Sequence, residues 1–491
     1  MKATPGHRPA YGKGGWIAGP ALALVCALVA ARAAAQPEAT APAPPPAAEQ
    51  APAEDALATV LRPVPGGLGL ERVAELAVKQ SFGVAAKQAE LRAAAAKVDQ
   101  AFVAYFPVAT LSAMYTRLSE VESGFKIEMP AIPGLDLSAF DFPIITNSYS
   151  LVASLAVPVS DYLLRLTQSY AAASEAAEAK RLEARAEALG VAADAKVAFL
   201  NWVRAKGQGA VAELAVDQTE AHLRDARAAS AAGLLASADV LRLEAQLEQT
   251  RHLARSAGAF QQLAAEQLRT VLHLAPEAPL GLGLDVMHAG AGPEQQPLAE
   301  LQRTALAQRL ELGAMDATRR SLAEVQAVTR AGYFPRLDGF ANFTLANPNQ
   351  RYFPQAEEWN GSWEAGARLS WTINETFATR GRSAQARATV QAIEQQAAAL
   401  RDGIRMSVAA AYYDAARARS AISAAERSEQ AAVESLRARR LLRRAGKATS
   451  TDIIDADTTL TRTRLQRIDA HIDLLVARTR LEHAVGAGGG G

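Results

Sequence analysis

The chain has 491 residues, with 52 basic and 51 acidic side chains and a formal net charge of +1. This balance leaves no broad basic surface and argues against a protein that binds the phosphates of nucleic acids. The single cysteine, Cys26, excludes an internal disulfide and a cysteine-based zinc site. Aromatic residues are only 6% of the chain, and long stretches rich in Ala, Leu, Glu, Arg and Gln favour a mainly helical fold.

The N-terminus predicts an export signal. Basic residues (Lys2, Arg8 and Lys13) precede an apolar stretch at 17–31, and three alanines at 33–35 fit a cleavage site. We therefore expect residues 1–35 to be a signal peptide. Residues 36–66 begin with a stretch dominated by Ala and Pro and predict an extended tether. No later stretch is long and apolar enough to predict a transmembrane helix.

An internal repeat organises the rest of the chain. The tripeptide Tyr-Phe-Pro occurs at 105–107 and again at 333–335, each time after a stretch with helical character. Further landmarks recur at an offset of 213, among them Gly233 with Asp239 and Gly446 with Asp452. A shared order of landmarks predicts two copies of one unit, with insertions in loops. We expect the first repeat at 67–275, a linker at 276–296, the second repeat at 297–486 and a disordered glycine tail at 487–491.

Each repeat is expected to contain two strands followed by a long helical hairpin. The expected strands are 108–118, 149–159, 337–345 and 363–373, with small or polar residues alternating with apolar ones. This alternation is typical of a membrane barrel with a wet interior, although four strands cannot close a barrel alone. The expected long helices, at about 167–230 and 378–444, contain no proline.

Gly233 and Gly446 fall where each long helix would turn back, since glycine accepts the left-handed conformation of a helix C-cap. Ser237 could cap the first returning helix, and either Ser450 or Thr451 could cap the second. The pattern therefore predicts two long antiparallel helical hairpins.

This repeated plan resembles the TolC family of outer-membrane efflux proteins. Residues 444–456 resemble the family's second hairpin tip, in which a glycine is followed by Asp-x-x-Asp, and residues 233–240 resemble its first tip. The two Tyr-Phe-Pro segments match the passage from helix to strand, and Asn374 lies near the return from strand to helix. The resemblance covers about residues 67–486.

The resemblance implies a homotrimer in the outer membrane. Each chain would give four strands to one 12-stranded barrel in the outer-membrane lipid, and its helices would form an α-barrel across the periplasm. Such a duct conducts substrates from an inner-membrane transporter, through a periplasmic adaptor protein, to the cell exterior. The family performs no chemistry on its cargo, so the resemblance implies neither an enzyme nor a cofactor.

Asp452 and Asp455 are the candidate selectivity residues. They lie at i and i+3, so both can face one side of the returning helix, and threefold symmetry would turn them into two acidic rings that favour cations. By spacing alone, the alternative is that these carboxylates complement a helix N-terminus. The resemblance favours the rings at a periplasmic entrance.

The entrance departs from the family's pattern. Related proteins often have Tyr three residues before the tip glycine and Arg two after it, whereas this chain has Arg443 and Ala448. We hypothesise that Arg443 pairs with Asp239 of the first hairpin as a gate latch. The resemblance also marks the hairpin tips as contacts for the adaptor, namely Gly233, Leu234, Gly446 and Lys447.

Two other classes of protein fit the sequence less well. An enzyme is disfavoured because the sequence has no glycine-rich phosphate loop, no G-x-S-x-G motif and no histidine pair at metal-ligand spacing. An exported coiled-coil structural or adaptor protein without a pore would also show long helices and a signal peptide. It would not carry the strand pairs and the Tyr-Phe-Pro segments twice, so the sequence favours a channel.

Overall fold

The computed structural model describes residues 59–120, 145–288, 290, 292–353 and 355–487, which all belong to one compact unit of the chain. The predicted signal peptide, most of the expected tether, the proline-containing loop with Pro130, Pro133 and Pro143, and the last four residues of the expected glycine tail lie outside the described residues.

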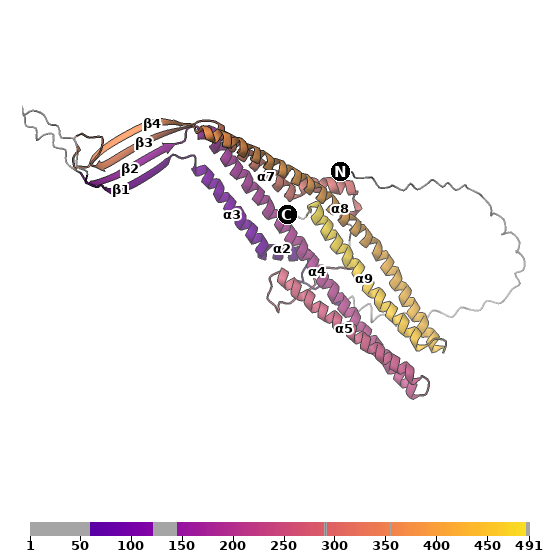
Figure 1. The fold of residues 1–491 in the computed structure, drawn as a ribbon. Coiled ribbons are helices and arrows are strands. Elements are labelled where there is room, and N and C mark those ends of the chain that lie inside the picture. Colours follow the sequence, from indigo (N-terminus) through magenta and orange to yellow (C-terminus); the bar gives the residue numbers. More distant parts are fainter. Residues whose placement is uncertain (1–58, 121–144, 289, 291, 354, 488–491) are drawn as a thin grey trace, which may run out of the picture. The chain divides into compact units, whose positions relative to one another are not determined.

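The α-helices and strands follow the same order in the two halves of the chain, whereas the short η segments differ (Figure 1). The first half contains α2 (Leu70–Gln80), α3 (Phe82–Val103), β1 (Val108–Arg117), β2 (Asn147–Val157), η2 (Tyr162–Leu166), α4 (Thr167–Ala231) and α5 (Ser237–Val271). The segment between the halves contains η3 (Pro293–Gln295). The second half contains α6 (Leu298–Gln308), α7 (Leu310–Arg330), η4 (Ala331–Tyr333), β3 (Arg336–Asn347), β4 (Asn360–Ser370), α8 (Ile373–Arg444) and α9 (Ser450–Val485). The predicted mainly helical fold with four strands is confirmed.

The two long helices, α4 with 65 residues and α8 with 72, form where the sequence lacks proline and is rich in strong helix formers. Each is followed by a shorter helix that runs back along it, α5 along α4 and α9 along α8 (Figure 1). The start of α8 differs from the expectation by five residues, because Thr372 is extended and serves as the N-cap. None of the described helices combines the length and the apolar character needed to cross a membrane.

The largest core lies where α4, α5 and α9 meet. Phe199 and Leu200 of α4 are fully buried, together with Leu268 of α5 and Ile468 of α9. Gly207 lies close to Ile468, since a Cβ on the glycine would be 3.2 Å from the Ile468 Cγ2 atom. This packing joins the two hairpins within one chain. A second core joins α6, α8 and α9, with Val408 and Leu481 among its buried residues.

The strands form one antiparallel sheet in the order β1-β2-β3-β4. The register pairs Val108 with Ala156, Ser154 with Asn342 and Asn342 with Glu364. β2 and β3 therefore join the two halves of the chain, and β1 and β4 are the edge strands. Each observed strand overlaps the corresponding predicted segment, with boundaries that differ by up to three residues.

Candidate functional site

Both hairpins turn at a glycine in the left-handed conformation, with φ of +73° at Gly233 and +71° at Gly446. At the first tip the Leu234 N–H donates to the Ala229 carbonyl at 2.9 Å, and the Gly233 N–H donates to the Ser230 carbonyl at 2.9 Å. This pair of bonds is the Schellman motif that ends a helix at a left-handed residue. The predicted C-caps are therefore confirmed.

The second tip repeats this geometry. Lys447 donates its N–H to Leu442 at 2.8 Å, and Gly446 donates to Arg443 at 2.9 Å. At the tips, the side chains of Leu234, which is 82% exposed, and Lys447 are open to solvent. Both tips thus present an exposed side chain directly after the glycine.

A capping box holds Asp452 at the start of α9. The Thr449 N–H and hydroxyl donate to Asp452 Oδ2 at 2.8 and 2.7 Å, and the Asp452 N–H donates to the Thr449 hydroxyl oxygen at 3.2 Å. The cap is thus Thr449, and the expected caps Ser450 and Thr451 are wrong. The expected cap Ser237 is wrong as well, because Ala236 holds the N-cap position of α5. The three-residue spacing from Thr449 to Asp452 is the capping-box signal that our sequence interpretation missed.

The two candidate selectivity carboxylates have different surroundings. Asp452 also accepts from Arg439 Nη1 of α8 at 2.5 Å. The backbone N–H of Thr449, followed by its hydroxyl and the charge of Arg439, lowers the pKa of Asp452 below its usual value. Asp455 is exposed, and among the described residues its carboxylate makes no ion pair. Asp452 is therefore engaged in local structure, whereas Asp455 is open to solvent.

Within one chain, residues other than the expected latch pair, Arg443 and Asp239, join the two hairpin tips. Arg443 donates to the Ser450 hydroxyl at 2.6 Å within its own hairpin, and no Arg443–Asp239 ion pair is found among the described residues. The tips are joined instead by Arg242 Nη1, which donates to the Thr451 hydroxyl at 2.5 Å. Ile454 of α9 also packs against the apolar cluster between α4 and α5.

A polar row that our sequence interpretation missed runs along α9. Asp457, Arg464, His471 and Arg478 recur every seven residues, and each residue, backbone included, is at most 8% exposed. Arg464 Nε lies 3.5 Å from Glu429 Oε1 of α8. A polar heptad position in an antiparallel helix pair can fix register, and the seven-residue spacing was the available signal.

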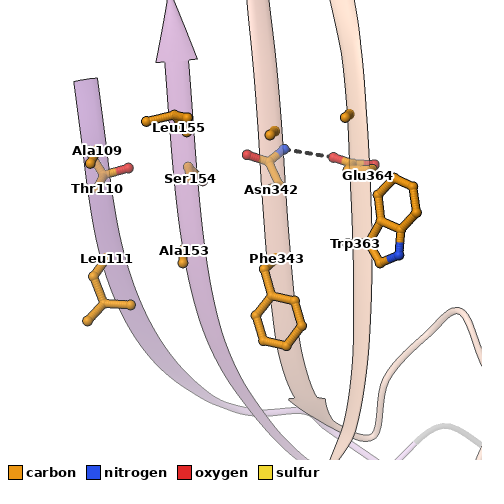
Figure 2. A pocket seen from close by; sticks show the side chains of 12 residues that line it. Ala109, Thr110, Leu111, Ala153, Ser154, Leu155, Asn342, Phe343, Trp363 and Glu364 are labelled. Atoms are coloured by element: carbon orange, nitrogen blue, oxygen red, sulfur yellow. Dashed lines mark hydrogen bonds between the residues drawn. The ribbon is translucent and has the colours of Figure 1, made fainter. Parts of the chain in front are cut away.

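The sheet has one polar and one apolar face, because successive side chains of a strand point to opposite faces. Figure 2 shows a polar row across the four strands, formed by Thr110, Ser154, Asn342 and Glu364. The Asn342 amide donates to Glu364 Oε1 at 2.8 Å, so both side chains lie on the same face. Residues at the centre of the sheet, from all four strands, line a shallow, open hollow of about 500 Å³.

The next row belongs to the opposite face and is apolar, with Leu111, Ala153, Phe343 and Trp363 (Figure 2). Phe343 and Trp363 are 51% and 73% exposed, so no described element covers this face there. An exposed apolar face of this kind fits contact with lipid.

Aromatic residues gather at both ends of the strands. Toward the ends of β1 and β2 away from the helices, the ring of Tyr149 lies 5.0 Å from that of Tyr115 and 6.1 Å from that of Trp359. At the helical end, the Tyr162 hydroxyl donates to the Tyr105 carbonyl at 2.7 Å, and Tyr105 contacts the ring of Phe102. Aromatic belts of this kind are typical of the two interfaces of a membrane-embedded sheet.

Comparisons with known proteins agree with this geometry. The sequence model for outer membrane efflux proteins matches residues 73–272 and 301–487. No curated protein matches the sequence. Among solved structures, the chain is similar to the outer membrane protein VceC from Vibrio cholerae, at 16% identity and a TM-score of 0.71, covering 85% of this chain and 96% of VceC.

Two further structures show the same fold. The Campylobacter jejuni CmeC outer membrane channel has 15% identity and a TM-score of 0.71, over 85% of this chain and 86% of CmeC. The Neisseria gonorrhoeae MtrE outer membrane channel, in its open state, has 16% identity and a TM-score of 0.69, over 85% of this chain and 88% of MtrE.

The fold of the described residues, with two helical hairpins and a four-stranded sheet, is that of outer-membrane channels. The chain belongs to the outer membrane efflux protein family. Its general role is therefore that of an efflux duct of the outer membrane. In the described part of the chain, no group of three or more His, Cys, Asp or Glu side chains is placed to hold a metal ion.

Proposed function

We propose that three copies of this chain form a duct through which an inner-membrane transporter, joined by a periplasmic adaptor, expels its cargo. The observation that carries the proposal is the two-faced sheet. The outer edges of β1 and β4 have no strand partner among the described residues, and one face of the sheet is polar and the other apolar. Pairing β1 of one copy with β4 of the next would satisfy both edges and close a 12-stranded barrel with a polar interior.

The helices favour the same assembly. α5 packs against α4, α4 against α9, and α9 against α8, so α5 and α8 are the outer helices of this set. In a closed ring of three copies, α8 of one chain would lie beside α5 of the next. Arg443 of α8 and Asp239 of α5 lie on these outer helices, and we therefore place the proposed latch between neighbouring chains. An exposed pair would contribute only up to about 1 kcal/mol per copy.

The remaining proposals follow from the sequence. Residues 1–35 would direct export, and the repeats at 67–275 and 297–486 would each give two strands and one hairpin. The exposed tips at Gly233, Leu234, Gly446 and Lys447 would contact the adaptor. Asp452 and Asp455 would line the periplasmic entrance, and Asp455 carries more of the proposed selectivity because its carboxylate is open to solvent.

The test is the conductance of the purified protein in a planar lipid bilayer, with a trivalent cation added to one side at a time. We expect steady conductance that is blocked from one side only. Asp455→Asn should weaken the block about tenfold, equivalent to about 1.4 kcal/mol, because three carboxylates are lost together. Asp414→Asn, at an exposed carboxylate of α8 paired with Arg417, is the matched control and should leave the block unchanged.

Two results would contradict the proposal. Equal block in wild type and Asp455→Asn would remove this residue from the entrance. A folded protein that is monomeric and does not insert into lipid would instead favour a coiled-coil protein of the envelope without a pore.

A further inference from the structure

One aromatic side chain breaks the pattern of the polar face of the sheet. Asp338, Phe340 and Asn342 alternate along β3 with residues of the apolar face, and therefore share one face. The Asn342–Glu364 hydrogen bond identifies this face as the polar one. Phe340 is half-buried there, between rows of polar residues. Its position needs an explanation that lipid contact does not supply.

The ring of Phe340 lies over a glycine. Gly366 is its register partner on β4, and a Cβ at Gly366 would come within 3.0 and 3.2 Å of the Phe340 Cζ and Cε1 atoms. A glycine within a strand often marks a place where another group approaches the backbone closely. The pair thus fixes the ring against the sheet, and the ring remains partly exposed.

Arg368 of β4 covers this ring. Its guanidinium carbon lies 5.4 Å from the centre of Phe340, which is within the range of a cation–π contact. Asp338 is opposite Arg368 in register, but its Oδ1 atom accepts from Arg336 Nε at 2.9 Å. Among the described residues, no carboxylate lies within ion-pair distance of Arg368. Its guanidinium donors are therefore available to a ligand.

The surrounding charges leave a positive excess. Arg336 also lies 3.5 Å from Asp161, and Asp161 lies 3.6 Å from Arg165. The nearby cations are therefore Arg165, Arg336 and Arg368, against the carboxylates of Asp161 and Asp338. Glu364, on the same face, is paired with Arg351 at 3.1 Å and leaves this excess unchanged. A planar guanidinium with free donors binds carboxylates well, and an adjacent aromatic ring adds stacking with a planar ligand.

We propose that Phe340 and Arg368 form a recognition position for aromatic organic anions on the polar face of the sheet. This inference deepens the proposed function and rests on it, because the polar face is then the wall of the conduit. Cargo that carries both a ring and a carboxylate would be retained there more strongly than a cation of the same size.

The test uses the full-length protein in detergent micelles and follows the ¹⁹F resonance of 4-fluorobenzoate, with 4-fluorobenzylammonium as the cationic counterpart. We expect fluorobenzoate to bind in preference to the cation. Arg368→Gln and Phe340→Leu should each weaken binding, by about tenfold for the arginine, where charge and stacking are lost together. Arg368→Lys keeps the charge and should still bind acetate-like anions, but lose the preference for an aromatic one.

Two control variants repeat these changes on the opposite face of the same sheet. Phe343→Leu removes an exposed ring from the apolar face. Arg117→Gln removes a cation of β1 whose guanidinium donates to Asn147 at 3.0 Å. Both should bind fluorobenzoate as the wild type does. Circular dichroism and the thermal midpoint of each variant establish that it is folded.

The outcomes separate the two proposals. Equal loss of binding in Arg368→Gln and Arg117→Gln, or no preference of the wild type for fluorobenzoate over the cation, would overturn the recognition position. Site-specific binding by a protein that forms no channel in lipid bilayers would overturn the proposed duct and leave the recognition position standing.

Discussion

Arg478 of α9 and Glu294 of the segment between the two halves form a buried, bidentate ion pair. Arg478 Nε donates to both carboxylate oxygens, at 3.1 and 3.0 Å, and Nη2 donates to Oε1 at 2.5 Å. The two side chains are 10% and 1% exposed. Gly292 lies so close that a Cβ there would clash with both partners. The pair therefore anchors the inter-repeat segment to the most buried part of α9.

We expect Glu294→Gln to destabilise the protein strongly, because it leaves the Arg478 guanidinium buried without its carboxylate. Breaking a buried pair in this way typically costs about 3–5 kcal/mol. Chemical denaturation in detergent measures the change. Glu300→Gln, an exposed carboxylate of α6, should change stability by less than about 0.5 kcal/mol. Equal effects of the two substitutions would show that the buried pair has no special role.

Substituting the tip glycines should destabilise the turns. Gly446→Ala places a side chain at a φ of +71°, where an L-residue costs about 1–2 kcal/mol. Hydrogen exchange at the amides around residue 446 should become faster. Gly258→Ala, within α5 and with open space around its Cβ, is the control and should stabilise its helix by about 0.5–1 kcal/mol. Slower exchange at the tip in Gly446→Ala would contradict the assigned turn.

Removing the cap of α9 tests the role of Thr449. Thr449→Ala should cost about 1 kcal/mol, because it removes the hydroxyl that bonds Asp452. Hydrogen exchange over the first turn of α9 reports the loss. Thr459→Ala is the control, since that hydroxyl donates only to the Asp455 carbonyl within the helix.

Asp452 makes the same turn sensitive to acid. The bonds from Thr449 lower the pKa of Asp452 in the folded protein. The contribution of the Asp452 carboxylate to stability is therefore complete above the ordinary pKa of 3.8 and is lost as pH falls through the lowered pKa. The protection factors of the amides in the first turn of α9, which are corrected for the pH dependence of intrinsic exchange, should therefore fall at acid pH in the wild type. This fall should be smaller in Thr449→Ala. An identical pH profile in both proteins would refute this linkage.

Buried histidines should make the whole fold less stable in mild acid. Burial lowers the pKa of His222, His471 and His483 in the folded protein. The unfolded chain then binds more protons, so stability falls as pH drops below the ordinary histidine value of 6.5. Replacing all three histidines by Gln should make the thermal unfolding midpoint depend less on pH between about 7.5 and 5.5, the range of histidine titration.

The control for the histidines is His252→Gln, at an exposed position of α5, which should leave the pH dependence unchanged. Burial raises the pKa of Asp457 in the folded protein, and this shift increases stability as pH falls, opposite to the effect of the histidines. The comparison is therefore between each variant and the wild type above pH 5. A wild-type midpoint that rises as pH falls through this range would contradict the prediction.

The sequence alone determined the elements and their order. Proline-free stretches rich in alanine fixed the long helices, Gly233 and Gly446 located the turns, and alternation located the strands. These signals are local, because they depend on backbone conformation and on the side-chain period within one element. The cap of α9 was also encoded locally, because Thr449 alone among the three competent caps is followed three residues later by a carboxylate. The sequence interpretation missed this spacing and favoured Ser450 or Thr451.

Only the tertiary structure decided which distant residues meet. Arg478 and Glu294 are 184 positions apart, and Phe340 and Arg368 lie on different strands, so no local pattern connects them. The same reason explains why Arg443 binds Ser450 within its hairpin, and why Arg242 rather than Arg443 joins the two tips. Side-chain partners depend on the packing of helices and the register of strands, which local sequence patterns do not specify.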